Sequence, residues 1–254
     1  MGAAPINILM YHSISDRSGP TSIPPAVFRT QMDLLAECGF RPVPLSELAD
    51  WLAGGAPLPP RPVVITFDDG FADFAEHAAP ILVALGWAAT VFLPTGRMGG
   101  PENWNGADTD PPRPLMSWDQ VRRLADQGIE FGGHSVTHPD LTALSPTDLE
   151  REVRQSGEDI GRCIGKVPTA FAPPYGASNA AVRGEIRKWY GVAVGTRLAR
   201  VSRGCDRYDL PRIEMHYFRD PARWRSYLEG RGEWYFALRR SLRAARRLTS
   251  FRRS

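Results

Sequence analysis

The sequence predicts an α/β protein in which repeated strand and helix units form one parallel sheet, closed or nearly closed into a barrel. Short apolar runs bounded by Gly, Pro or Asp alternate with amphipathic stretches along almost the whole chain. A length of 254 residues with 43% apolar residues suits a single domain with a sizeable core. A doubly wound open sheet is the alternative. It is disfavoured because the glycine-rich nucleotide-binding patterns G-x-G-x-x-G and G-x-x-x-x-G-K-[ST] are missing.

Seven segments have the features of strands, namely short apolar runs that end at turn residues. They are INILMY (6–11), PVVITF (62–67), AATVFLP (88–94), IEFGGH (129–134), TAFAPP (169–174), VAVGT (192–196) and LPRIEM (210–215). In a barrel of such units, chemistry gathers where strands end and the following loops begin. Polar residues directly after these segments are therefore the first candidates for a functional site.

Helical periodicity fills the intervals between these strands, and several helix ends carry capping residues. The clearest amphipathic stretches are VFRTQMDLLAECG, FADFAEHAAPILVALG and LEREVRQSGEDIGRCIG. The end signals are a capping box at Ser117 and Gln120, caps followed by proline at Ser145 and Asp220, and terminating glycines at Gly39 and Gly86. His77 lies inside the second stretch, three residues before Pro80, and is interpreted as structural.

Residues 95–116 form the longest stretch without periodicity. Loops of this length are typical of functional lids or mobile segments. Trp104 in this loop either stacks on a sugar ring or packs the loop against the barrel, and the sequence leaves both interpretations open.

The C-terminal residues differ in charge from the rest, so we divide the chain into a barrel over residues 1–230 and a basic tail over residues 231–254. The tail holds eight arginines and one glutamate, a net charge of +7, which leaves about −4 of the total of +3 for the barrel. Its apolar positions 235, 238, 242, 245 and 248 predict an amphipathic helix. Such a helix docks on an anionic membrane or packs against the barrel. No nucleic-acid partner is expected, because no binding motif accompanies the charge.

The cysteines and the N-terminus indicate in which cellular compartment the protein is expected. Cys38, Cys163 and Cys205 are odd in number and lack C-x-x-C spacing, which argues against a disulfide framework and a zinc ribbon. The N-terminus has no positively charged region before its short apolar run, and no run of 18 apolar residues occurs. We expect a cytoplasmic protein, or one peripheral to the inner face of a membrane.

Two adjacent acids follow the second predicted strand in VVITFDDGF. Asp68 and Asp69 repel each other, and burial of both costs several kcal/mol unless a cation or hydrogen bonds compensate. A helix-capping aspartate beside a solvated one is the alternative interpretation.

Two histidines four residues apart follow the fourth predicted strand in FGGHSVTHPDL. On a helical turn, His134 and His138 would face the same way and could share a metal. With a carboxylate from the strand-end pair they form a three-ligand set that leaves coordination positions open, as catalytic metal sites do.

These segments resemble the polysaccharide deacetylase family, carbohydrate esterase family 4. Its T-F-D-D-G motif is matched by residues 66–70, and its H-[ST]-x-x-H motif by residues 134–138. The third motif, R-x-P-Y, is matched in part: Pro174 and Tyr175 are present, but Ala172 stands where the family has arginine. The resemblance covers residues 5–215. It implies a distorted (β/α) barrel of about seven strands, a divalent metal, and hydrolysis of N-acetyl groups on amino-sugars.

The resemblance also implies a role for each matched residue. Asp69, His134 and His138 are the metal ligands, and Asp68 is the general base. The backbone N–H of Tyr175, next to Pro174, stabilises the oxyanion. Zn is the first expectation for the metal, with Co, Ni or Fe as alternatives, because two nitrogens and one oxygen suit all four.

The family's general acid, a histidine in a C-terminal L-x-H strand motif, has no good match, since His216 lies in PRIEMHYF. By elimination, and by likeness to the circularly permuted poly-N-acetylglucosamine deacetylase branch with its N-terminal Y-H strand, His12 is the expected acid. We expect its ring beside the metal ligands, on the side opposite Asp68.

Arg212 is the candidate to replace the missing motif-three arginine by pairing with Asp68. The alternative is a surface ion pair worth about 0–1 kcal/mol. The expected function is removal of N-acetyl groups from an oligo- or polysaccharide or a carrier-linked glycan. The alternatives are a non-sugar C–N hydrolase on the same scaffold and a non-catalytic carbohydrate-binding protein.

Overall fold

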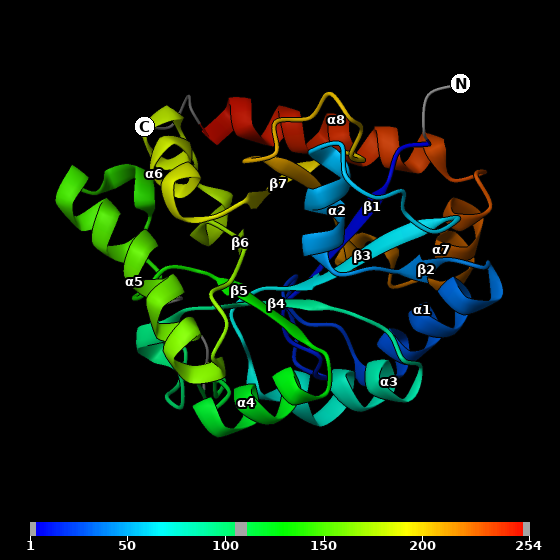
Figure 1. The fold of residues 1–254 in the computed structure, drawn as a ribbon. Coiled ribbons are helices and arrows are strands. Elements are labelled where there is room, and N and C mark those ends of the chain that lie inside the picture. Colours follow the sequence, from blue (N-terminus) through cyan, green and yellow to red (C-terminus); the bar gives the residue numbers. More distant parts are fainter. Residues whose placement is uncertain (1–3, 105–110, 251–254) are drawn as a thin grey trace.

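The chain folds into a parallel barrel with helices on its outside (Figure 1). The computed structural model describes residues 4–104 and 111–250, without the side chains of residues 233 and 243–250. The strand order is β1-β8-β7-β6-β5-β4-β3-β2, and an additional β1–β3 pairing closes seven strands into a ring. The strands are β1 (Asn7–Tyr11), β2 (Arg41–Pro42), β3 (Pro62–Phe67), β4 (Thr90–Leu93), β5 (Glu130–Gly133), β6 (Ala170–Phe171), β7 (Val192–Leu198) and β8 (Leu210–Glu214). The predicted barrel is thus confirmed, and the open sheet is excluded.

Strand β2 is an element that the sequence does not predict. It has two residues, and it pairs with the beginning of β3 through Arg41 opposite Pro62. Further along β3, Thr66 lies opposite Thr90 of β4. A run this short has no periodicity, so only the tertiary pairing identifies it. The sharing of β3 between β2 and β4 is one of the distortions of the barrel.

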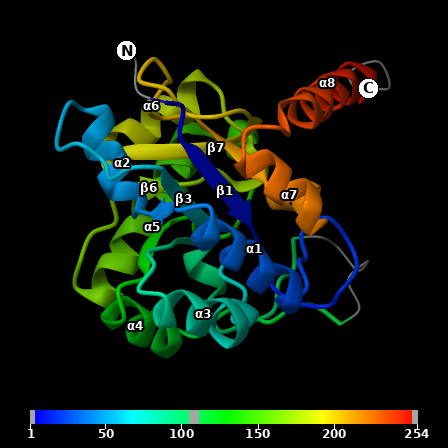
Figure 2. The same ribbon diagram turned by 90° about the vertical axis from the view of Figure 1, so that its right-hand side faces the viewer.

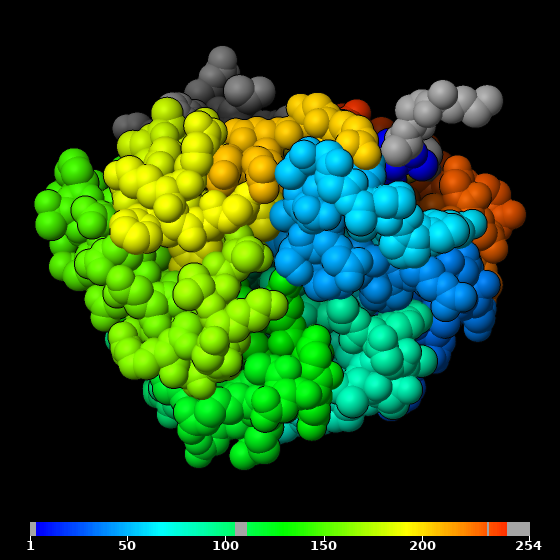
Figure 3. Space-filling model, viewed as in Figure 1, coloured from blue at the N-terminus to red at the C-terminus, as the bar shows by residue number. Residues whose placement is uncertain are grey.

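Helices cover the outside of the ring, and Figure 3 shows the side chains of α2, α5 and α6 over the face viewed in Figure 1. The helices of the described chain are α1 (Pro25–Glu37), α2 (Leu45–Leu52), η1 (Phe74–Ala78, a π-helix), α3 (Ala79–Ala84), η2 (Thr95–Arg97), α4 (Trp118–Asp126), η4 (Leu141–Ala143), α5 (Pro146–Ile164), η5 (Pro174–Gly176), α6 (Ala180–Trp189), η6 (Met215–Phe218), α7 (Pro221–Leu228) and α8 (Glu233–Ser250). The predicted N-caps Ser117, Ser145 and Asp220 all accept backbone hydrogen bonds, and Ser117 forms the full capping box.

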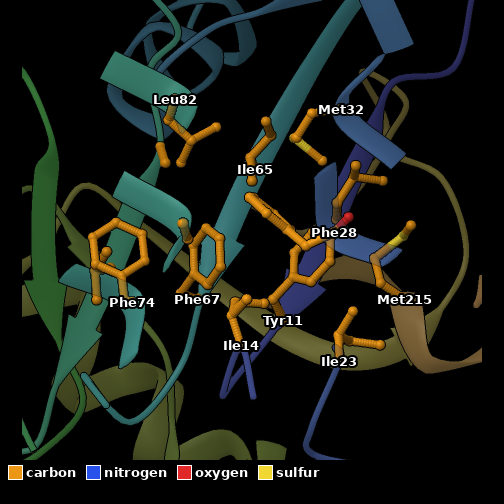
Figure 4. Close-up of a cluster of buried hydrophobic side chains, with 14 of the residues drawn as sticks. Tyr11, Ile14, Ile23, Phe28, Met32, Ile65, Phe67, Phe74, Leu82 and Met215 are labelled. Carbon is orange, nitrogen blue, oxygen red and sulfur yellow. The ribbon is translucent and has the colours of Figure 1, made fainter. Parts of the chain in front are cut away.

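Side chains along β1 and β3 alternate between the helical layer and the barrel interior. Tyr11 and Phe67, which end these strands, pack outward, and the Phe67 ring centroid lies 4.7 Å from that of Phe74 in η1 (Figure 4). Ile8 and Val64 belong to the separate interior cluster. Because successive strand residues point to opposite faces, the residue that follows each strand turns toward the mouth of the barrel.

Candidate active site

Asp69, His134 and His138 bring one carboxylate oxygen and two imidazole nitrogens together. Nε2 of each histidine lies 3.2 Å from Oδ1 of Asp69, and the three donor atoms lie within 4.8 Å of one another. All three residues are buried, and all three line one pocket. Two nitrogens and one oxygen with an open side fit the divalent metal that the sequence resemblance implies.

The backbone directly after β6 orients His134. Its Nδ1 lies 2.6 Å from the carbonyl oxygen of Ala172. A carbonyl only accepts hydrogen bonds, so Nδ1 carries the proton and Nε2 keeps its lone pair for a metal. The end of β5 also packs closely against Tyr190, so that a glycine is needed directly before His134: a Cβ at Gly133 would lie 2.4 Å from the hydroxyl oxygen of Tyr190.

The segment from His134 to His138 is a strained turn and not the helical turn expected from the four-residue spacing. Ser135 and His138 both have φ of 65°, in the left-handed region. The N–H of His138 donates to Oγ of Ser135 at 3.0 Å. Asp69 and Tyr175 also have positive φ, so four of the five such non-glycine residues in the described chain lie at this site. Strained backbone of this kind persists where the surrounding structure holds it.

Glu152 of α5 supplies that support, a role that was not predicted from the sequence. Its buried carboxylate accepts hydrogen bonds from the N–H of Val136 and of Thr137, both at 2.8 Å, and from the Thr137 hydroxyl at 2.9 Å. One signal could have identified it: Glu152 lies three residues after Leu149, on the buried face of an amphipathic helix. A charged residue in an apolar stripe needs a polar partner.

Asp68 is paired with Arg212, as the sequence predicts. Nη1 and Nη2 of Arg212 donate to Oδ1 and Oδ2 of Asp68 at 2.6 and 2.7 Å. Arg212 is fully buried, so the alternative of a surface ion pair is wrong. It also donates to the carbonyl oxygen of Gly195 at 2.8 Å and to the Thr66 hydroxyl at 3.2 Å. The guanidinium is therefore held in one geometry by its other contacts.

The two adjacent carboxylates are both held in their ionised form. Burial raises the pKa of Asp68, whereas the charge and hydrogen bonds of Arg212 lower it. The net result is a pKa below the usual value of an aspartate. Burial also raises the pKa of Asp69, but hydrogen bonds with His134 and His138 bring it well below its usual range. Burial lowers the pKa of His138, which favours the neutral imidazole that binds a metal.

His12 lies at the mouth of the barrel beside Asp68. Strands β1 and β3 pair with Tyr11 opposite Phe67, and the N–H of Asp68 donates to the carbonyl oxygen of Tyr11 at 2.9 Å. The residues that follow are thereby neighbours, and Nε2 of His12 lies 3.9 Å from Oδ2 of Asp68. The expectation that His12 lies opposite Asp68 is wrong, because strand pairing sets the two side by side. His12 lines the pocket and does not enter the helical layer.

Comparison with known proteins decides the family. The profile of the polysaccharide deacetylases matches residues 55–194, more than half of the chain. The chain belongs to the polysaccharide deacetylase family. The protein named "Putative polysaccharide deacetylase YxkH" of Bacillus subtilis (strain 168) is 25% identical over 227 residues, which cover 89% of this chain and 77% of YxkH.

Two further relatives are similar in sequence or in structure. The poly-β-1,6-N-acetyl-D-glucosamine N-deacetylase of Escherichia coli (strain K12) is 30% identical over 143 residues, 50% of this chain and 20% of that enzyme. The solved structure of the Streptococcus pyogenes deacetylase PplD in complex with acetate superposes with a TM-score of 0.73 at 25% identity, covering 83% of this chain and 92% of PplD.

The pocket of this polysaccharide deacetylase family member has a volume of about 230 Å³. Besides His12, Asp68 and the three candidate ligands, it is lined by Trp104 and Tyr175. Tyr175 is 55% exposed, and its ring centroid lies 4.8 Å from that of His138. Pro174 is buried in η5 directly before it. The pocket thus has a buried polar floor and aromatic walls.

The predicted loop over residues 95–116 is fixed at its base, whereas residues 105–110 lie outside the described residues. Glu102 and Arg113 form a buried ion pair, with Nη2 of Arg113 2.7 Å from Oε2 of Glu102. Trp104 stacks on His138 at a centroid distance of 4.2 Å. Trp104 therefore packs against the site itself, and its contact with a sugar ring stays a prediction.

Proposed function

We propose that the chain removes acetyl groups from amino-sugar residues of an oligosaccharide or polysaccharide, with a divalent metal held by Asp69, His134 and His138. One observation carries the proposal: a single pocket unites this ligand set with an ionised carboxylate, Asp68, and an imidazole, His12. A base and an acid beside an open metal site are what amide hydrolysis requires.

The residues of the pocket have separate tasks in this reaction. When bound, the divalent ion polarises the acetyl carbonyl and lowers the pKa of water toward about 7. Asp68 removes a proton from the water whose oxygen forms the new bond to the acetyl carbon. The backbone N–H of Tyr175 donates a hydrogen bond to the developing oxyanion. His12 donates a proton to the sugar nitrogen as the C–N bond breaks, which releases acetate and the amine.

The contact between Asp68 and His12 suits the return of the site to its starting state. After one turnover Asp68 carries the proton taken from water, and His12 lacks the proton given to the amine. Oδ2 of Asp68 lies 3.9 Å from Nε2 of His12, so the proton has only a short distance to cover between the two side chains. Arg212, through its two hydrogen bonds, favours the ionised form of Asp68 and so assists this transfer.

The size of the pocket suits one acetamido group, with the rest of the substrate outside it. Its volume of about 230 Å³ is below the roughly 300 Å³ at which pockets begin to enclose whole drug-sized ligands. We take an amino-sugar polymer as the substrate class, because the Escherichia coli relative is named for poly-β-1,6-N-acetyl-D-glucosamine.

Acetate release tests the proposal. Protein stripped with a chelator and reloaded with Zn, Co, Ni or Fe is offered β-1,6-linked N-acetylglucosamine oligomers and chitooligosaccharides. We expect release only from reloaded protein, and we expect His12→Ala to lower it about 10²- to 10⁴-fold at unchanged metal content. His77→Ala, an exposed histidine of η1, is the control and keeps full activity. Hydrolysis of cyclic amides or formyl groups alone would favour the non-sugar hydrolase, and no release from reloaded protein would favour a binding protein.

A further inference from the structure

Helix α8 is attached to the barrel through its first turn. Tyr235 and Phe236 are buried, and the Tyr235 hydroxyl donates to the carbonyl oxygen of Tyr217 at 3.0 Å. The ring centroids of Tyr235 and Phe218 lie 5.7 Å apart. In the second turn, Arg239 lies over the ring of Tyr217, 4.6 Å from its centroid. Beyond Arg239 the helix runs clear of the barrel, as Figure 2 shows. The sequence left two interpretations of the tail, packing against the barrel and docking on a membrane. The first of these applies to the beginning of α8, where Tyr235 and Phe236 are buried.

An apolar stripe on α8 faces solvent. Trp234, Leu238 and Leu242 are 68%, 46% and 46% exposed. They follow one another at intervals of four residues, which places them on one side of a helix. The other exposed large apolar side chains in the described part of the chain lie outside α8 and form no such stripe of three: Val83, Leu85, Val167, Tyr175 and Trp189. A continuous exposed stripe of this kind marks an interaction surface.

Strong positive charge accompanies the stripe. Arg240 is exposed, and the sequence continues with arginines at 243, 246, 247, 252 and 253. The tail thus carries +7 on a protein whose other residues sum to about −4. Among the described residues, no helix has the length and apolar character needed to cross a bilayer. We infer that α8 is a docking surface for an anionic lipid bilayer and lies in the plane of the interface.

The chemistry of the helix favours a bilayer over a second copy of the chain. Tryptophan is enriched at the boundary between lipid and water, and basic residues are attracted to anionic headgroups. Pairing two copies through the same stripe would bring two tails of +7 together, and that repulsion opposes a symmetric dimer. The inference rests on α8 alone and is independent of the proposed reaction.

Vesicle sedimentation of the full chain tests the inference. We expect the protein to sediment with vesicles of phosphatidylcholine and phosphatidylserine, to stay in solution with phosphatidylcholine alone, and to be released by high salt. Leu238→Asp with Leu242→Asp should weaken the binding about tenfold or more, because charges enter the apolar stripe. Val83→Asp with Leu85→Asp, at 38% and 40% exposure elsewhere on the surface, is the matched control and should bind as the unaltered chain does.

Two further measurements make the result decisive. Circular dichroism melting shows whether each double variant remains folded, so that lost binding is not lost structure. Analytical ultracentrifugation without vesicles detects a second copy. Absence of sedimentation with anionic vesicles, an equal loss in the control pair, or self-association that disappears in the α8 variant without any vesicle binding would each overturn the inference.

Discussion

The two carboxylates of the site are adjacent in sequence but belong to two halves of it that are built differently. Asp69 faces His134 and His138, which come from one turn after β5. Asp68 faces Arg212 and His12, which come from opposite ends of the chain. The ligand half, formed by Asp69, His134 and His138, therefore depends on the turns after β3 and β5. The proton-transfer half, formed by Asp68, Arg212 and His12, depends on closure of the barrel through β1, β3 and β8.

This difference separates two kinds of failure. A change in the ligand half should remove the metal and with it all activity. A change in the proton-transfer half should leave the metal in place and slow the reaction. The metal content of each variant, measured beside its turnover, reports which half has been affected.

The largest effect is expected in the ligand half, from His134→Ala. The variant removes one of three donor atoms, so metal affinity should fall by more than the roughly 10- to 100-fold that loss of a ligand's hydrogen-bond partner costs. Elemental analysis after dialysis, together with acetate release, measures both effects. His77→Ala serves as the control, because it removes an exposed histidine. A His134→Ala protein that retains stoichiometric metal would contradict the ligand assignment.

The converse result is expected from Asp68→Asn. The amide keeps the shape of the side chain but takes up no proton, so turnover should fall about 10²- to 10⁴-fold. Metal content should match that of the unaltered protein, because Asp68 is not among the three clustered donors. If Asp68→Asn lost the metal together with activity, the division of the site into two halves would fail.

The two halves also differ in how well the sequence predicts them. Asp69, His134 and His138 lie in two short motifs that directly follow predicted strands, so the pattern of residues was enough to group them. His12 needed elimination, and its side of the site was predicted wrongly. A sequence gives the order of strands along the chain, whereas the β1–β3 register that places His12 beside Asp68 arises only when the barrel closes.

The contacts that hold the site residues in place were the hardest part of each half to predict. The sequence predicted that Arg212 pairs with Asp68, but it could not predict that the pairing consists of two parallel hydrogen bonds. Glu152 was not identified, because several charged residues lie close to it in the sequence and only its position on the buried face of the helix distinguishes it from them. The two-residue strand β2 and the left-handed turn at Ser135 share the same cause: each is too short for a periodic pattern and is fixed by tertiary contacts.

In the proton-transfer half, Arg212→Ala tests the support of the base. Loss of the guanidinium leaves Asp68 buried without its cation, so both turnover and stability should fall, the free energy of unfolding by about 3–5 kcal/mol. Arg207→Ala removes a partly exposed arginine and is the matched control. Turnover per folded molecule is the deciding measurement, taken with chemical denaturation. Equal effects of the two substitutions on turnover would refute a role for Arg212 in the reaction.

The smallest effect, in the ligand half, is expected from Glu152→Gln. The amide oxygen can keep part of the hydrogen bonding to Val136 and Thr137 but loses the charge, so the turn that carries His138 should loosen without unfolding. Metal affinity should fall about 10- to 100-fold, the usual cost of altering the support of a metal ligand. Glu158→Gln, on the exposed side of the same helix, is the matched control.

Turnover in the presence of excess metal distinguishes Glu152→Gln from a variant of the proton-transfer half. Because Glu152 contacts the turn and not the reacting groups, excess metal should restore the turnover of Glu152→Gln. The same excess should leave Arg212→Ala slow, since its ligand half is intact. A Glu152→Gln protein that binds metal normally but reacts slowly would place Glu152 in the proton-transfer half, and the separation between local turns and barrel closure would then be lost.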